Sequence, residues 1–442
     1  EFQVTVVDAN SYTITTGSAL PAGSYGGSAV VAAYQLNVGP ALAVPLVGWG
    51  GGTWGGGTWG NGSVTYSEMR IWNQMNYGED LVFGPRGGGL YYWDATGGVT
   101  TRGVLLSSLG GTATITIASP AVVTSTVLYT EGAAIKFSTT GALPTGITAG
   151  TTYYVYNVDG LTFQLLDSTG VVVNTSGSQS GTQSITPVDV PLYQNNLTVS
   201  DSSRFILVFG TNDYGSSTLD PMLIRWSNQD DPYNWTPDAT NQAGSSRLSH
   251  GSQIVTTVQT RQEIFVLTDS SAYSLQYLGP PYVWQPQLMG DNISVISPNA
   301  VAQASGIVYW MGVDKFYKYD GRVQTLNCDL RRFVFQDINQ SEALQIFGST
   351  VEAFNEVWWF YCSADSNQPN RYVVYNYMEN IWYYGTMTRT AWLDSGLQPY
   401  PLAATLNNRL TFQENGVDDN ETGTPAPIEA YISSSEFDIG DG

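Results

Sequence analysis

The sequence predicts an all-β protein, a β-propeller built from four-stranded blades with a small inserted β-module. Three observations predict this fold class. Helical periodicity is nearly absent, and we expect one short helix within residues 329–345. Short β-branched or aromatic runs are separated by Gly, Asn, Asp and Pro, the residues that form turns. A pair of neighbouring strands then recurs along the chain at a regular spacing.

Each repeat consists of a short apolar strand, a turn and a second strand that is rich in Tyr or Trp. Clear copies fall at residues 81–93, 205–226, 264–278, 307–319 and 357–375, and a weaker sixth begins near residue 410. We mark five copies by one residue each, Ile206, Phe265, Val308, Val357 and Leu410. Consecutive marker residues are 59, 43, 49 and 53 positions apart. A period of about 40–50 residues with hairpins inside it is typical of propeller blades.

The first interval is longer than the others, because Val82 and Ile206 are 124 residues apart. Residues 112–187 account for the excess, since removing these 76 residues leaves a spacing of 48. This stretch is rich in Thr, Ser, Val and Gly, has no Trp, and has one basic residue, Lys136. We therefore predict a small inserted β-domain at 112–187.

Four parts follow from these patterns. They are residues 1–47, an N-terminal β segment that we expect to be part of a truncated module; 48–111, a Trp/Gly-rich loop and the first blade; 112–187, the inserted domain; and 188–442, the remaining blades and a C-terminal segment. A single blade cannot bury both of its faces, so radial packing against neighbours is what would stabilise it. The alternative is a set of stacked β-sandwiches, which give shorter strand spacing without this long period.

Composition and charge exclude several classes of protein. The chain has 442 residues with a formal net charge of −21, and only 12% of the residues are charged. Hydrophobic residues reach 42% and aromatic residues 13%, which argues against a disordered polyelectrolyte. A surface that grips DNA needs clustered Lys and Arg, and an acidic chain does not favour one. No apolar run of about 18 residues is present, so no membrane-spanning helix is expected.

A glycine-rich loop carries three tryptophans at a period of five residues, Trp49, Trp54 and Trp59. A phosphate-binding loop would need a following Lys and a helix, and neither is expected here. Trp is favoured at the centres of protein interfaces, so these three residues are our candidate interface residues. The alternative is that the rings pack on the loop's own fold.

Few residues in the chain have the chemistry of a catalytic or metal site. The one histidine, His250, lies in a turn next to Gly251, and no nucleophile elbow of the Gly-x-Ser-x-Gly type accompanies it. One His and two cysteines, Cys328 and Cys362, make a zinc site improbable, and we expect the thiols to be buried and inert. We expect no cofactor and no small-molecule substrate.

Paired carboxylates are the best enzymatic hypothesis. Asp230 and Asp231 precede Pro232 and Trp235, and two acids near aromatic residues could hydrolyse a glycoside. An Asp-Pro turn explains the same residues. The acids of residues 418–421 could bind calcium, although they lack the EF-hand spacing, and a solvated loop is the alternative. We therefore predict that the protein is not an enzyme and has no catalytic or metal-binding residues.

Several segments resemble the tail nozzle proteins of short-tailed bacteriophages, also called packaged-DNA stabilization or tail hub proteins. The resemblance is strongest over residues 204–416, about half of the chain, and its specificity comes from the order and number of the segments. These are residues 226–237, 278–281, 296–301, 308–321, 335–339, 356–361, 372–377 and 385–392. The Trp/Gly-rich loop is also similar to a region of this family that precedes the blades.

The resemblance implies a structural protein of the virion. Six copies would form a ring, a hexamer, at the distal end of the phage tail, below tail adaptor and portal-side ring proteins, with tail fibres or spikes around it. The ring would be a conduit and gate that retains packaged double-stranded DNA and lets it pass into the host at infection. A negatively charged channel wall fits this role, because each contact between a Lys or Arg and the phosphates of a moving duplex adds an attraction that must be broken again.

Two other functions remain open at this stage. A β-propeller rich in Trp and Tyr could be a carbohydrate-binding tail adhesin or a glycan hydrolase, and it could also be an interaction scaffold unrelated to phage. A hydrolase should place acids at equivalent positions of several blades, and no such set is evident in the sequence. The mass of the assembled species separates a ring from a monomer that binds glycans.

Overall fold

The structure is a computed structural model that describes residues 4–8, 11–14, 69–108, 111–129, 131–239, 241–394, 396–421 and 423–428. The chain divides into two compact units, Glu1–Val38 and Gly39–Gly442. In the first unit, β1 (Val4–Asp8) pairs antiparallel with β2 (Ser11–Ile14). All other described strands belong to the second unit. The predicted boundary at residue 47 lies outside the described residues.

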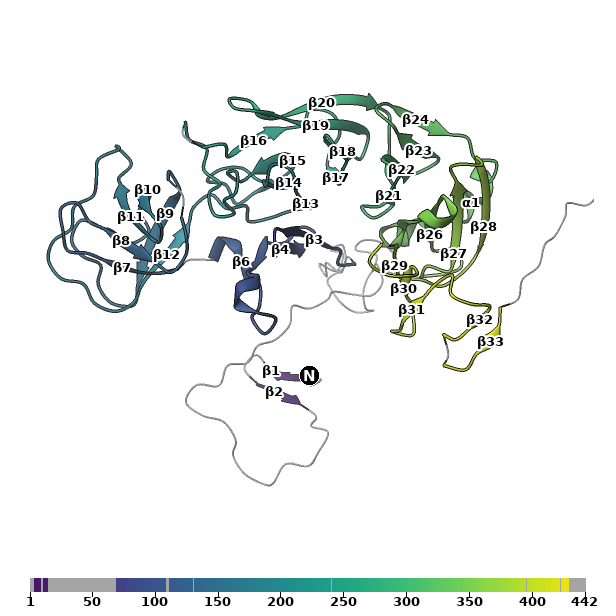
Figure 1. Cartoon of the computed structure of the whole chain (residues 1–442), viewed down its shortest axis with the longest axis horizontal. Coiled ribbons are helices and arrows are strands. Elements are labelled where there is room, and N and C mark those ends of the chain that lie inside the picture. The colour runs from purple at the N-terminus through teal and green to yellow at the C-terminus, as the bar shows by residue number, and fades with distance from the viewer. Residues whose placement is uncertain are drawn as a thin grey trace, which may run out of the picture. The chain divides into compact units, whose positions relative to one another are not determined.

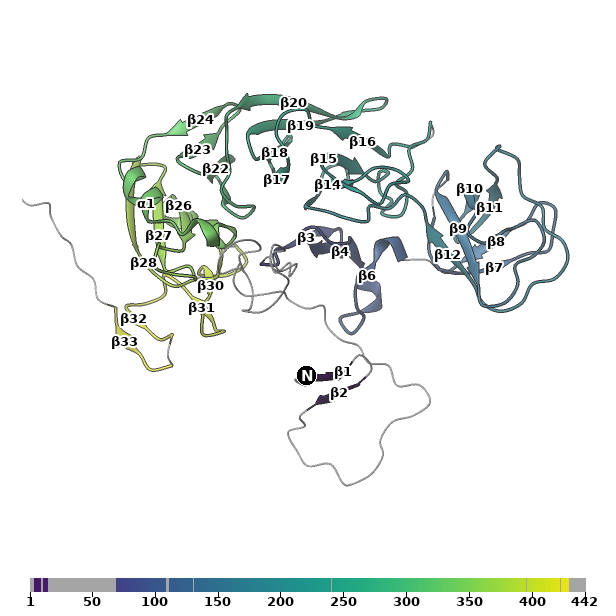
Figure 2. The ribbon, with the colours of Figure 1, turned by 180° about the vertical axis from the view of Figure 1, so that it is seen from behind.

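The second unit contains six antiparallel sheets arranged as a β-propeller, which confirms the predicted fold class (Figures 1 and 2). In each sheet the strands follow chain order, so every strand pairs with the next strand along the chain. The first sheet comprises β3 (Trp72–Tyr77), β4 (Asp80–Pro85), β5 (Tyr91–Trp93) and β6 (Val104–Leu105); the second, β13 (Asn196–Val199), β14 (Ile206–Asn212), β15 (Leu219–Trp226) and β16 (Gly244–Arg247); the third, β17 (Ile254–Gln259), β18 (Ile264–Thr268), β19 (Ser271–Gly279) and β20 (Val283–Asp291).

The remaining three sheets complete the set. The fourth comprises β21 (Val301–Ala304), β22 (Ile307–Met311), β23 (Phe316–Tyr319) and β24 (Val323–Leu326); the fifth, β25 (Phe347–Val351), β26 (Glu356–Tyr361), β27 (Arg371–Asn376) and β28 (Ile381–Thr386); the sixth, β29 (Ala391–Leu393), β30 (Leu402–Ala404) and β31 (Leu410–Phe412). A separate hairpin follows, β32 (Asp418–Asp419) with β33 (Ala426–Pro427). Five sheets therefore have four strands, and the sixth has three in the part of the chain that is described.

The second strand of a sheet is the most deeply buried one. Every residue of β14, β18 and β26 is buried, on both faces of the strand. Both faces are covered because each sheet packs between two neighbours, and such strands read as continuous apolar runs. This is why second strands supply four of the marker residues of the sequence repeat, Ile206, Phe265, Val308 and Val357. The fifth marker, Leu410, was misplaced: it lies on β31, the third strand of the sixth sheet, and is 77% exposed.

Hydrophobic cores lie between consecutive sheets. Each of five core clusters joins two neighbouring sheets, from the first and second to the fifth and sixth. In the cluster between the fourth and fifth sheets, Trp359 is fully buried and its indole Nε1 donates a hydrogen bond of 3.0 Å to the carbonyl of Ala300. A sheet thus depends on its neighbours for burial, as radial packing requires.

Residues 112–187 form a closed barrel of six strands, in the order β10-β11-β8-β7-β12-β9. The strands are β7 (Thr112–Ile115), β8 (Val123–Ser125), β9 (Ala134–Thr139), β10 (Thr152–Asp159), β11 (Thr162–Leu166) and β12 (Gln183–Pro187). The barrel has its own core, which includes Phe137 and Phe163, and it enters and leaves the propeller between the first and second sheets.

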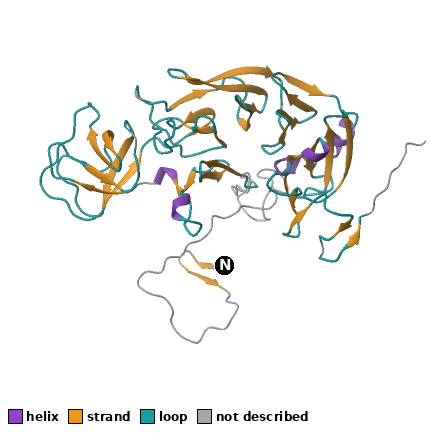
Figure 3. Cartoon of the chain, viewed as in Figure 1, coloured by secondary structure: helices purple, strands orange, loops and turns teal. Residues whose placement is uncertain are grey.

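Helices are few in the described residues (Figure 3). The expected helix is shorter than residues 329–345. It splits into α1 (Arg331–Asp337) and a 3-10 helix (Gln340–Gln345), and other single 3-10 turns are Ala95–Gly97, Leu106–Ser108 and Glu352–Phe354. Val334 anchors α1 in the core between the fourth and fifth sheets. No helix among the described residues is long and apolar enough to cross a membrane.

Candidate functional site

The first strands of all six sheets line one pocket at the centre of the propeller. Its volume is about 450 Å³. The lining includes one short segment in or just before the first strand of each sheet: residues 72–75, 196–198, 256–259, 298–299 with 301, 347–348 and 390–392. Most of these segments lie where an inner strand begins, so the pocket lies toward the end of the propeller at which those strands start.

Side-chain hydrogen bonds connect the inner strands of the first three sheets. The Asn73 amide donates 2.9 Å to the Gln194 side chain, and Asn196 donates 3.5 Å to Asn73. The hydroxyl of Thr257 donates 2.6 Å to the Asn196 side chain and lies 2.6 Å from the hydroxyl of Thr198. This chain of contacts orients the polar groups on one wall of the pocket.

Arg86, in the turn after β4, links the backbones of the second and third sheets next to the same wall of the pocket. One terminal nitrogen of its guanidinium donates 2.8 Å to the carbonyl of Asn195 and 2.8 Å to that of Val255. The first, second and third sheets are therefore held together by a cation that binds backbone carbonyls. A guanidinium suits this position because it presents several donors in a rigid plane.

None of the residues that line the pocket is charged. Amides, hydroxyls and the aromatic rings of Trp72, Phe347 and Trp392 make up much of the surface. The side chains of Gln74 and Asn299 are exposed and make no hydrogen bond to the other described residues. The pocket therefore offers neutral hydrogen-bonding groups beside aromatic faces, and its size matches a small ligand. A turn of duplex DNA, about 34 Å long, does not fit in it.

His250 does not belong to a catalytic triad in the described part of the chain. Its ring Nδ1 lies 2.9 Å from the hydroxyl of the adjacent residue Ser249, and the side chain is exposed. Asp269, a carboxylate near this turn, instead accepts hydrogen bonds from the backbone and side chain of Ser252. The residue lies in the turn that the sequence indicates.

The paired acids Asp230 and Asp231 stabilise a turn and do not face one another across a cleft. Asp230 adopts a positive φ of 56°, and its carboxylate lies 2.6 Å from Nε of Arg204. Asp231 is buried, and its carboxylate accepts a 2.9 Å hydrogen bond from the backbone of Tyr233. Both acids thus have structural contacts of the kind expected for an Asp-Pro turn.

The remaining candidate residues from the sequence are the two cysteines, the acids of residues 418–421 and the three tryptophans. Cys328 and Cys362 are free thiols, half-buried and buried respectively, and burial raises their pKa to about 11 and about 12. Glu421 is bound by Arg389 at 3.0 Å. No group of three or more metal-ligating side chains occurs within the described ranges. The candidate interface residues Trp49, Trp54 and Trp59 lie outside the described residues.

The sequence did not mark the pocket residues. Its repeat is carried by the second and third strands of each sheet, which bury large apolar side chains. The inner strands are short and mixed in polarity, as in Asn73, Asn196 and Thr257. The only feature of the sequence that could have identified these inner strands is that each one precedes an apolar run. That feature becomes informative only when the sheets are known to share an axis.

Comparison with known proteins identifies no family. No protein-family model matches the chain, and no curated protein matches it. Among solved structures, the chain is similar to Hsv2 of Kluyvelomyces marxianus, with a TM-score of 0.30 and 9% sequence identity over 64% of this chain and 75% of that chain. The class of the protein is therefore defined by its own architecture, a β-propeller with an inserted barrel.

Proposed function

We propose that this protein is a structural subunit of a phage virion, which forms a ring-shaped tail nozzle through which packaged DNA is retained and then released. The observation that carries the proposal is how the few basic side chains are used. Of 16 Lys and Arg residues, at least nine bind acids or carbonyls within the chain, while 37 acids give a net charge of −21. Few cations are left to hold a phosphate backbone.

The DNA path in this proposal lies between several copies of the chain. The axial pocket of about 450 Å³ is too small for a duplex, so the propeller is a wall and the lumen is enclosed by a ring of subunits. A negative wall repels phosphates and lets a duplex move without repeated release of counterions. Neighbouring partners would be the adaptor and portal-side rings and the tail fibres or spikes.

The experiment is to measure the mass of the assembled protein by native mass spectrometry and to image end-on views by electron microscopy. We expect a closed ring with a hole at least about 20 Å wide, which admits a duplex. A duplex-binding assay at low salt is expected to show no retention. A persistent monomer, or tight binding to DNA that weakens steeply with salt, would contradict the proposal.

A second candidate is a carbohydrate-binding tail adhesin or a glycan hydrolase. The uncharged pocket favours it, because its lining includes the amides of Gln74 and Asn299 and the ring of Trp72, which suit a neutral polyhydroxy ligand. Under this candidate, titration with a glycan library gives a binder at micromolar affinity, and Gln74→Ala with Asn299→Ala abolishes that binding. Unchanged binding in this double variant, or no binder at all, excludes the pocket as a glycan site.

A further inference from the structure

An exposed surface with aromatic rings and arginines lies beside α1 and β28. The rings of Phe333 and Tyr384 lie in contact, tilted by 42° with their centroids 4.5 Å apart, and 39% and 51% of these residues are exposed. The guanidinium of Arg371 lies over the Phe333 ring at 5.7 Å and forms an ion pair of 2.9 Å with Asp337, so the net positive charge of the surface comes from Arg332. Arg332 is exposed, with no ion pair to the other described residues. We call Phe333, Tyr384, Arg332 and Arg371 the basic-aromatic surface.

This surface adjoins a cationic stretch of an acidic chain. Residues 314–332 contain five of the 16 basic residues and three of the 37 acidic residues, so the stretch has a charge of +2 and the rest of the chain −23. Exposed aromatic side chains together with Arg are the composition found at the centres of protein interfaces. An acidic partner is the one that this surface attracts.

A second exposed surface has the opposite charge and lies on the sixth sheet. Among the described residues, no strand pairs with the outer edge of β31, where the other five sheets have a fourth strand. Leu410 and Phe412 are 77% and 48% exposed on this strand, and Val417 is 79% exposed just before β32. Residues 394–428 contain five acids and one arginine. We call Leu410, Phe412, Val417, Asp418 and Asp419 the acidic edge.

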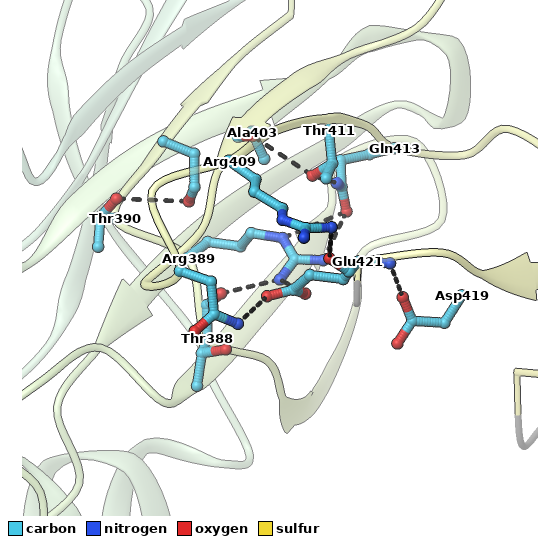
Figure 4. A network of polar contacts seen from close by, with 11 residues as sticks. Thr388, Arg389, Thr390, Ala403, Arg409, Thr411, Gln413, Asp419 and Glu421 are labelled. Atoms are coloured by element: carbon cyan, nitrogen blue, oxygen red, sulfur yellow. Dashed lines mark hydrogen bonds and ion pairs between the residues drawn. The ribbon is translucent and has the colours of Figure 1, made fainter. Parts of the chain in front are cut away.

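The hairpin that carries Asp418 and Asp419 is held on the sixth sheet by a network around Glu421 (Figure 4). The Glu421 carboxylate lies 3.0 Å from Arg389, and its backbone carbonyl accepts 2.7 Å from Arg409. Arg389 also donates 3.1 Å to the buried side chain of Gln413. Because the ion pair is largely shielded from solvent, it fixes the acidic edge before a partner arrives, which lowers the entropy cost of binding.

We propose that the basic-aromatic surface of one copy of this chain docks on the acidic edge of the next copy. The proposal rests on the proposed function, since both need copies to assemble. Two surfaces of opposite charge on one chain give a head-to-tail contact, and repetition of that contact closes into a ring when the rotation allows. A contact between two identical surfaces would place like charges together, which the charges here oppose.

The test is to reverse one charge on each surface and measure oligomer size by sedimentation velocity. Arg332→Glu and Asp418→Lys are each expected to weaken association at least about tenfold, because each brings like charges together. Arg261→Glu is the matched control, since Arg261 is exposed on the turn between β17 and β18 and its reversal should leave association unchanged.

Mixing the two variants distinguishes a head-to-tail contact from a symmetric one. A copy with Asp418→Lys keeps its basic-aromatic surface, and a copy with Arg332→Glu keeps its acidic edge, so the mixture should form heterodimers or larger species that neither variant forms alone. Phe333→Ala should weaken assembly as Arg332→Glu does, with thermal unfolding used to show that the propeller stays folded.

Each outcome has a defined meaning. Assembly that is insensitive to Arg332→Glu or to Asp418→Lys, or variants that do not rescue one another, overturns this contact but leaves the proposed ring in place. A wild-type chain that stays monomeric at all concentrations overturns both this contact and the proposed function.

Discussion

The inserted barrel and the propeller sheets use the same kind of strand but bury it in different ways. The barrel closes on itself by hydrogen bonds within 76 residues, and its core cluster draws almost only on its own side chains. Each propeller sheet is open, and its core is shared with the next sheet. The barrel should therefore behave as an independent unit, whereas one sheet cannot be disturbed without its neighbours.

The largest expected effect is in the propeller. Trp359→Ala should lower the free energy of unfolding by about 3–5 kcal/mol, because it empties a core that the fourth and fifth sheets share. Amide hydrogen exchange should rise in both β22 and β26. Phe163→Ala in the barrel is the control, with a similar cost but faster exchange confined to residues 112–187. Exchange that rises in only the fifth sheet would contradict a shared core.

Deletion of residues 112–187 tests the independence of the barrel directly. Its two ends lie side by side, since the backbone of Ile185 donates 2.8 Å to the carbonyl of Gly111, so a short Gly-Ser linker can replace it. We expect the propeller to fold with a loss of about 2 kcal/mol, from the apolar surface of Tyr233 that becomes exposed. Loss of cooperative unfolding by circular dichroism would show that the boundaries are wrong.

The contact between the two regions should have a smaller effect. Tyr233 packs against Tyr129 of the barrel at 6.1 Å and against Tyr92 of the first sheet at 5.9 Å between ring centroids. A double-mutant cycle of Tyr129→Ala and Tyr233→Ala should give a coupling energy of about 0.5–1.5 kcal/mol. A coupling near zero in urea denaturation would mean that this stack does not join barrel and propeller.

The smallest expected effect concerns pH and a polar contact between the third and fourth sheets. Burial of Glu263 disfavours its charged form, but hydrogen bonds from Ser274, Tyr319 and Gln276 outweigh this and lower its pKa below the ordinary 4.5. The Tyr319 hydroxyl donates 2.5 Å across the junction between the sheets. This carboxylate therefore stabilises the fold above pH 4.5, and the stabilisation is lost as the pH falls through its lowered pKa.

Glu263→Gln should accordingly cost about 1 kcal/mol at neutral pH, after allowance for solvent screening of a half-exposed group. The difference between variant and wild type should vanish as the pH falls below 4.5. Melting temperatures of variant and wild type between pH 3 and pH 7 measure this difference in stability. A stability difference that does not change with pH would exclude the Glu263 carboxylate as its cause.

The sequence by itself determined the fold class and the positions of the first five repeats, but it placed the sixth repeat too late, near the third strand of the sixth sheet. Strands such as β14, β18 and β26 are buried on both faces, so they must be apolar along their whole length, and that requirement is visible in any single copy. The excess spacing before Ile206 likewise marked the stretch that forms the barrel.

Only the tertiary structure decided where polar residues meet. Asn73, Asn196 and Thr257 are far apart in the chain and come together because the first strands share an axis. Glu421 binds Arg389, and the ring of Phe333 contacts that of Tyr384, across loops whose path the sequence does not encode in any local pattern. Burial produces a recognisable pattern in the sequence because it constrains successive residues along a whole strand. A long-range polar contact constrains only one residue at each end.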